Sequence, residues 1–324
     1  MEKIKQKDLY KNWQAVAPGV WRMRDLFVNV YVVHNPHDNS WVLVDAGLKT
    51  SAPKIKRMVE HLFWPELRPA GIVLTHGHFD HVGSLQALAD EWEVPVYAHY
   101  MERPYLTGQS SYPPPDPTVG GGMMASMAWM YPKGPVDIGR HLSILPKDGT
   151  IPCLPEWKYI HTPGHAPGHI SLFRERDRVL LAGDAFVTTQ QESATSVMMQ
   201  KKKICGPPKY FTYNWTSAEE SVKKLAALEP EIVATGHGQP MRGAEMRNAL
   251  HNLAQNFEEE AKPSHGRYVD DPAYVNSEGV EDVPPPATPV GLLLTIAGLA
   301  AAVALTWWLV KERRKKRLFG FSHN

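Results

Sequence analysis

A run of seven residues, Thr75 to His81, constrains this chain more than any other part of its sequence. It reads THGHFDH and places four side chains that can bind metals within six positions. The apolar stretch Ile72 to Leu74 precedes it and predicts a buried strand that ends at the run. Without a metal, burial of this cluster would leave several polar groups unpaired, at about 1–3 kcal/mol each. The run therefore predicts a metal site on a loop at a strand end.

Three later segments add ligands of the same kinds. Each has a glycine-bearing turn, and two of these turns directly follow a short apolar strand. Imidazole and carboxylate groups are the ligands that zinc and similar divalent ions prefer. Turns at strand ends allow a rigid sheet to aim such side chains. The additional candidates are His165 in TPGHAPGH, Asp184 after Gly183, and His237 between two glycines.

With these motifs in this order, residues 16–250 resemble the metallo-β-lactamase superfamily, and among its members the glyoxalase II-like hydrolases. The resemblance implies an α/β (α+β) fold, a four-layer αββα sandwich with metals at one edge. It implies two metal ions with one bridging carboxylate, and a supporting aspartate at Asp45. We expect His169 to support the site in the same way, through contact with a ligand. The implied ligands are His76, His78 and His165 for one ion, Asp80, His81 and His237 for the other, and Asp184 for both.

The resemblance predicts a hydrolase. Two divalent ions, Zn²⁺ in our expectation and Fe or Mn as alternatives, can share a hydroxide that attacks an ester, thioester or lactone carbonyl. Asp80 is also the candidate to carry the proton. Two alternatives stay open: a persulfide dioxygenase-like oxidoreductase with a single iron at His76, His165 and Asp184, and a phosphodiesterase or nuclease of the same fold. A non-catalytic metal-binding protein is a third.

Single positions favour some family members over others. Asp184 argues against antibiotic hydrolysis, because the antibiotic-hydrolysing zinc enzymes do not use aspartate at the bridging position. Val187 stands where lactonases often carry tyrosine, and residues 218–262 have no clear counterpart of the glutathione-binding extension of glyoxalase II. A net charge of +1 gives no electrostatic attraction to nucleic acid, so we expect no nucleic-acid partner.

Two segments are expected to shape a pocket for a small-molecule substrate. Residues 101–139 are rich in Pro, Gly, Met and Tyr, and residues 188–215 form the second segment. A methionine-rich wall would suit an apolar or acyl substrate. A helical cap packed on the domain is the alternative interpretation. The sequence gives no indication of an oligomeric state.

The domain organisation follows from composition. Residues 1–262 are expected to form the catalytic domain, 263–289 an acidic, proline-rich linker, 290–310 a transmembrane helix and 311–324 a basic tail. The basic tail should stay cytoplasmic, which would place the domain outside. The first ten residues nevertheless contain no signal peptide. We therefore expect a single-pass membrane protein with a cytoplasmic catalytic domain.

Overall fold

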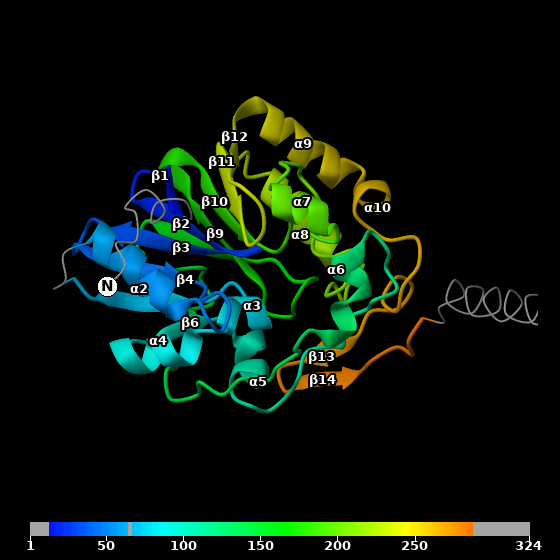
Figure 1. Cartoon of the computed structure of the whole chain (residues 1–324), viewed down its shortest axis with the longest axis horizontal. Helices are drawn as coiled ribbons and strands as arrows, with labels where there is room; N and C mark the ends of the chain where they lie inside the picture. The colour runs from blue at the N-terminus through cyan, green and yellow to red at the C-terminus, as the bar shows by residue number, and fades with distance from the viewer. Residues whose placement is uncertain (1–12, 64–66, 288–324) are drawn as a thin grey trace, which may run out of the picture. The chain divides into compact units, whose positions relative to one another are not determined.

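Two β-sheets stack face to face in the computed structural model, which describes residues 13–63 and 67–287 (Figure 1). Both sheets are mixed: β1 to β4 are antiparallel neighbours and β4 to β7 parallel ones, whereas in the second sheet only β10 and β11 run parallel. The first sheet contains, in spatial order, β1 (Trp13–Ala17), β2 (Val20–Asp25), β3 (Val28–Asn35), β4 (Ser40–Val44), β5 (Pro69–Val73), β6 (Val96–Ala98) and β7 (Leu142–Ile144). The second contains β12 (Met241–Arg242), β11 (Ile232–Thr235), β10 (Val179–Gly183), β9 (Ile170–Arg174) and β8 (Trp157–His161).

Helices cover the outer face of each sheet. The longer ones are α2 (Ala52–Leu62) and α4 (Leu85–Trp92) on the first sheet, and α8 (Trp215–Ala226) and α9 (Gly243–Gln255) on the second (Figure 1). The shorter ones are α3 (Phe79–Val82), η1 (Tyr100–Glu102), α5 (Arg103–Leu106), α6 (Met123–Ser126), η2 (Ala128–Met130), η3 (Glu175–Asp177), α7 (Ala194–Met199) and α10 (Phe257–Glu260).

Strand alternation builds the layers. In β4, Val42 and Val44 join the core between the sheets, whereas Trp41 and Leu43 face the core under α2 and α4. This is the period of two that a strand buried on both faces requires. A third core lies between the second sheet and α8 and α9. The layers are therefore helix, sheet, sheet, helix, which confirms the predicted αββα sandwich.

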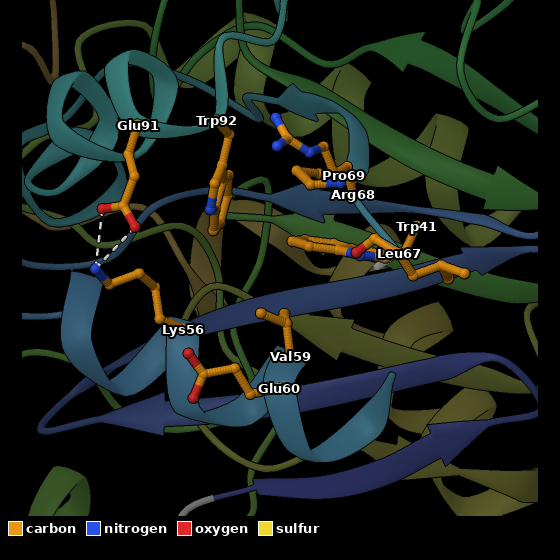
Figure 2. Close-up of a pocket in the computed structure, with 9 residues that line it drawn as sticks. All are labelled: Trp41, Lys56, Val59, Glu60, Leu67, Arg68, Pro69, Glu91 and Trp92. Carbon is orange, nitrogen blue, oxygen red and sulfur yellow. Dashed lines mark hydrogen bonds and ion pairs between the residues drawn. The ribbon is translucent and has the colours of Figure 1, made fainter. Parts of the chain in front are cut away.

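The outer face of the first sheet carries a pocket that none of the candidate ligands lines. Figure 2 shows the Trp41 and Trp92 rings meeting edge to face, with centroids 5.2 Å apart. Beside them Lys56 Nζ of α2 lies 2.9 Å from Glu91 Oε2 of α4. The pocket contains no histidine and no aspartate. The ion pair links α2 to α4, and the ring contact packs α4 on β4.

The segment after residue 262 differs from the extended linker that its composition predicts. Residues up to Pro285 belong to one compact unit with the sandwich, and β13 (Tyr274–Asn276) and β14 (Gly279–Asp282) form a hairpin. Tyr268 and Ala273 are each 3% exposed and pack in the core with α8 and α9. The Tyr268 hydroxyl donates to the Pro114 carbonyl at 2.6 Å. A few apolar side chains therefore outweigh the acidic, proline-rich composition and hold this segment on the domain.

No helix within residues 13–63 and 67–287 is long and apolar enough to cross a bilayer. The predicted membrane span, residues 290–310, and the basic tail, 311–324, lie outside the described residues.

The packed segment leads to a stability prediction. Tyr268→Ala removes a buried ring and a hydrogen bond and is expected to lower the free energy of unfolding by about 3 kcal/mol. The matched control is Tyr274→Ala, whose ring is exposed and whose loss should cost less than about 0.5 kcal/mol. Urea unfolding followed by circular dichroism measures both. Equal, small effects would instead indicate a detached linker.

Candidate metal centre

The ligand run spans a turn and the beginning of a short helix. Thr75 follows β5, His76 and His78 lie on the turn, and Asp80 and His81 belong to α3. All four candidate ligands are buried, and the most exposed, Asp80, is 6% exposed. The sequence predicted a loop here, and the structure places the second half of the run on a single helical turn. The turn and the short helix bring the imidazole and carboxylate side chains of this run into one cluster.

The remaining ligands come from the second sheet. His165 lies in the turn between β8 and β9, Asp184 follows β10, and His237 follows β11. Strands β10 and β11 run parallel, so their carboxyl ends bring Asp184 and His237 to the same edge of the sheet. Gly236 is required there, because a Cβ atom on it would lie 2.0 Å from Asp184 Oδ1. The two sheets therefore contribute ligands to one edge of the sandwich.

Asp184 occupies the middle of the cluster. Its Oδ2 atom lies 3.0 Å from His237 Nε2, 3.5 Å from His165 Nε2 and 3.6 Å from His81 Nε2. His237 Nε2 also lies 3.5 Å from Asp80 Oδ2. One carboxylate thus faces histidines from three different segments of the chain.

The structure brings all seven predicted ligands together. Their ligand atoms form overlapping groups of three in which every atom lies within 4.8 Å of the others. His78 Nδ1 and His165 Nε2, for example, are 3.0 Å apart. The groups are His76, His78 and His165; His76, His81 and Asp184; and Asp80, His81 and His237.

The donor set fits divalent cations. His76 Nε2, His81 Nε2 and Asp184 Oδ1 are buried and have no hydrogen-bond partner among the described residues. Buried polar atoms are almost always paired, so several orphaned atoms at one point indicate an additional positively charged partner. Nitrogen and carboxylate oxygen in this number match the preferences of zinc and related ions.

Electrostatics keeps three of the histidines neutral. Burial, together with the neighbouring imidazoles, holds the pKa of His76 and of His78 well below the ordinary value. Burial likewise lowers the pKa of His165 to about 3, although Asp184 opposes this. A neutral imidazole is the form that binds a metal. These three side chains are therefore ready to act as ligands at neutral pH.

The other ligands are electrostatically coupled. Burial lowers the pKa of His81, but the carboxylates of Asp45 and Asp184 outweigh burial and hold it well above its ordinary value. Burial opposes ionisation of Asp184, yet His237 and His81 hold the pKa of this carboxyl well below its usual range. The ionised Asp184 thus carries the negative charge that bound cations require.

Asp45, the supporting aspartate that the resemblance implies, contacts the ligand run through its side chain. Its Oδ1 accepts from the Thr75 backbone N–H, and its Oδ2 from the Thr75 hydroxyl, both at 2.8 Å. The same Oδ2 lies 2.8 Å from His81 Nδ1. A partner at Nδ1 fixes the orientation of the ring and leaves Nε2 to face the site.

His169 contacts the turn of Asp184, the candidate bridging ligand. Its Nε2 accepts from the Asp184 backbone N–H at 2.8 Å, and its Nδ1 lies 2.8 Å from the Thr162 hydroxyl. The ring is completely buried. His169 therefore fixes the start of the turn that carries Asp184, and its ring centroid lies 5.1 Å from that of His76.

Asn29 of β3 holds the turn that carries His237. Its side-chain amide donates to the carbonyls of Thr235 and Gly238, at 2.8 and 2.7 Å, on either side of the ligand. His237 Nδ1 lies 2.7 Å from the Phe27 carbonyl. The sequence analysis missed this support, because no motif marks an asparagine that is some 200 residues away from its partners.

Glu102 is a second missed residue, and it joins two ligand turns. Its Oε2 accepts from the Gly77 N–H at 2.8 Å and from the Tyr112 hydroxyl, and its Oε1 accepts from the Gly168 N–H at 2.7 Å. Gly77 stands between His76 and His78, and Gly168 stands in the turn of His165. Burial raises the pKa of this carboxyl to about 7, although Tyr112, Gly168 and Gly77 lower it.

Aromatic side chains surround the ligand cluster. Phe211 stacks on His78 with centroids 4.4 Å apart, and Phe79 lies 5.6 Å from Tyr131. Tyr131 and Phe211 belong to the two segments that the sequence analysis proposed as pocket walls. The same segments include the short elements α6, η2 and α7. The exposed methionines in and between these elements are Met123, Met127, Met130, Met198 and Met199.

The hydrogen bonds of Glu102 to the two ligand turns lead to a stability prediction. Glu102→Gln presents an amide N–H₂ to a backbone donor, and one N–H group loses its acceptor. We expect a loss of about 1–3 kcal/mol in the free energy of unfolding at pH 5. A raised folded-state pKa means that this carboxyl contributes stability below pH 4.5, which is lost as the pH rises to about 7. The cost of the substitution should therefore shrink over this window.

Urea unfolding of both proteins at pH 5, 6, 7 and 8 measures the difference. Tyr105→Phe is the control, because the buried Tyr105 hydroxyl has no partner among the described residues and its removal should be neutral or stabilising. A cost that grows between pH 5 and 7 would contradict the raised pKa.

Comparison with known proteins agrees with the geometry. The family model of the Metallo-beta-lactamase superfamily matches residues 23–237. A Bacillus subtilis protein, "Probable metallo-hydrolase YflN", is 46% identical over 239 residues, which cover 74% of this chain and 90% of the relative. The "Uncharacterized protein YobT" of the same organism is 31% identical over 237 residues, covering 69% of this chain and 89% of the relative.

Solved structures share the fold. A beta-lactamase domain protein from Burkholderia ambifaria aligns with a TM-score of 0.54 at 19% identity, over 75% of this chain and 72% of the other. The matched residues 23–237 include every candidate ligand from His76 to His237. The chain belongs to the metallo-β-lactamase superfamily.

Proposed function

We propose that this protein is a metal-dependent hydrolase that acts on an ester, thioester or lactone carbonyl. It would use two divalent ions, and zinc is the expected metal. The observation that carries the proposal is the overlap of the ligand groups. His76, His78 and His165 make one group and Asp80, His81 and His237 another, while Asp184 lies against histidines of both. The printed name of the 46% identical relative, a probable metallo-hydrolase, also supports hydrolysis.

The bound ions would activate water and stabilise charge, and the chain holds their ligands in place. When bound, two divalent ions lower the pKa of water and stabilise negative charge on a carbonyl oxygen. The chain holds the ligands rigidly through Asp45, His169, Asn29 and Glu102. Rigid support reduces the reorganisation that charge development would otherwise require.

We assign the transfer of the proton to the Asp80 carboxylate. Its Oδ2 lies 3.5 Å from His237 Nε2, and it is the most exposed of the seven ligands. Burial raises the pKa of this carboxyl against the lowering effect of His81 and His237. A carboxyl with a raised pKa is suited to accept a proton from water and return it to a leaving group.

Metal analysis tests the proposal. The purified full chain is expected to contain two zinc or other divalent ions, and His237→Ala, which removes a ligand of one group only, about one. The control is His251→Ala, whose ring pairs with Glu229 on the surface. Elemental analysis by mass spectrometry measures all three. A single iron in the wild-type protein would instead favour the persulfide dioxygenase alternative.

Activity completes the same test. The zinc-loaded chain is expected to hydrolyse p-nitrophenyl esters or acyl thioesters, to lose the activity with a chelator and to regain it with zinc. Asp80→Asn should reduce kcat at least about 100-fold, since it removes the proton carrier and one ligand. Hydrolysis of bis-p-nitrophenyl phosphate with no action on carbonyl substrates would identify the phosphodiesterase alternative.

We also propose that residues 290–310 anchor the chain in a membrane as a single-pass helix, with the catalytic domain in the cytoplasm. The run contains 21 residues without a charge and precedes a basic cluster. Such a length suits a hydrocarbon core of about 30 Å.

Fractionation tests the anchor. The full chain should sediment with membranes and resist alkaline carbonate, whereas a chain that ends at residue 287 should stay in the supernatant. Leu299→Arg in the full chain is an intermediate case, because a charge in the middle of the run disfavours insertion by roughly 3 kcal/mol. Recovery of the full chain in the supernatant would reject the anchor.

A further inference from the structure

A cavity of about 550 Å³ lies beside the ligand run and has no role in the chemistry described so far. Three segments form its walls: residues 48–50 after Asp45, residues 77–83 of the ligand run and α3, and residues 132–136 of the proline-rich segment. Its volume falls within the range of roughly 300–1,000 Å³ that small-molecule sites occupy.

The cavity adjoins the metal centre through Phe79. Gly77 and Phe79, which flank His78 in sequence, both line it. The Phe79 ring lies 5.6 Å from Tyr131, which directly precedes the third wall, and 6.2 Å from Phe211, which stacks on His78. The cavity thus lies next to the ligand run in sequence and shares Gly77 and Phe79 with it, although none of the seven candidate ligands lines it.

The cavity lining is largely apolar and carries two positively charged side chains. Lys49 and Lys133 are its only charged residues, and both are exposed. Neither forms an ion pair with an acidic side chain within residues 13–63 and 67–287. The apolar lining consists of Leu48, Phe79, Val82, Pro132, Pro135 and Val136. Two unpaired ammonium groups above an apolar surface favour a ligand that is apolar along its length and anionic at its end.

Both lysines are attached to the ligand run by short contacts. The Lys133 carbonyl accepts from the Tyr112 N–H at 2.9 Å, and the Tyr112 hydroxyl contacts Glu102 and the Gly77 N–H. Lys49 lies over α3, where a Cβ atom on Gly83 would lie 2.4 Å from its backbone nitrogen. The backbone at Lys49 and Lys133 is thus packed near the ligand run.

We propose that this cavity binds the tail of the substrate, and that the tail is an acyl chain ending in a carboxylate, which Lys49 and Lys133 recognise. The lysine ammonium is a compact charge on a flexible stem, so both lysines can follow one carboxylate at the end of a flexible chain. The proposal rests on the proposed hydrolase function and names its substrate class. It replaces the simple apolar substrate expected from the methionine-rich sequence with an amphipathic one.

The test compares two esters with the full zinc-loaded chain: p-nitrophenyl hexanoate and the mono-p-nitrophenyl ester of hexanedioic acid. They have the same chain length and differ only in the terminal carboxylate. The double variant Lys49→Gln, Lys133→Gln should raise KM for the acidic ester about tenfold, with kcat within twofold. For the neutral ester, kcat/KM should stay within twofold.

The matched control is Lys147→Gln, Lys158→Gln, which removes the same charge from exposed lysines outside the cavity. It should leave both esters unaffected, which separates local recognition from the effect of net charge. Sodium chloride at 0.5 M should raise KM for the acidic ester in the wild type but not in the double variant. Equal effects of the cavity variant on the two esters, or no effect on the acidic one, would overturn the proposal.

A binding measurement separates this proposal from the hydrolase function. The dissociation constant of monobutyl hexanedioate, measured by calorimetry, should be at least about tenfold higher for the cavity variant than for the wild type or the control. This result supports the cavity site even if neither ester is hydrolysed, in which case only the proposed hydrolysis fails. Equal affinity in all three proteins, or no binding to the wild type, overturns the cavity site.

Discussion

The hydrogen bonds of one buried carboxylate, that of Asp45, determine much of this structure. Asp45 ends β4 in a left-handed backbone conformation, with φ +63°, and its side chain accepts from Thr75 and meets His81. Its own N–H donates to the Val73 carbonyl at the end of β5. The ends of two parallel strands and the first turn of α3 are thus tied to one side chain. A side chain of another length could not reach all three.

The other ligand turns have supports of the same kind. Asn29 holds the turn of His237, His169 the start of the turn of Asp184, and Glu102 joins the run of His76 to the turn of His165. Each support is buried, and each bonds to a backbone N–H or carbonyl group in or beside a ligand turn. Ligand geometry is therefore fixed through the main chain, where few atoms can move.

The sequence was sufficient to predict what is local and repetitive. A strand, a glycine turn and a candidate ligand recur several times, so these motifs and the family resemblance that they carry were sufficient to predict the sandwich and to select seven side chains that the structure brings together. Glu102 and Asn29 could not be predicted, because neither lies in a motif and both act on residues distant in sequence. The segment 263–285 was misjudged for a different reason: its composition resembles a linker, and only its contacts show that Tyr268 and Ala273 complete a core.

The division of the ligands between two sheets links metal affinity to the docking of the halves of the molecule. His76 to His81 follow a strand of the first sheet, whereas Asp184 and His237 follow strands of the second. Separation of the sheets would disperse the ligands, so metal binding and sheet docking stabilise each other by the same free energy. A substitution that creates a cavity near Val42 and Leu172, in the core between the sheets, would thus weaken metal binding without changing a ligand. The packing of the hydrophobic interior therefore contributes to the affinity for the metal, although no core side chain is a ligand.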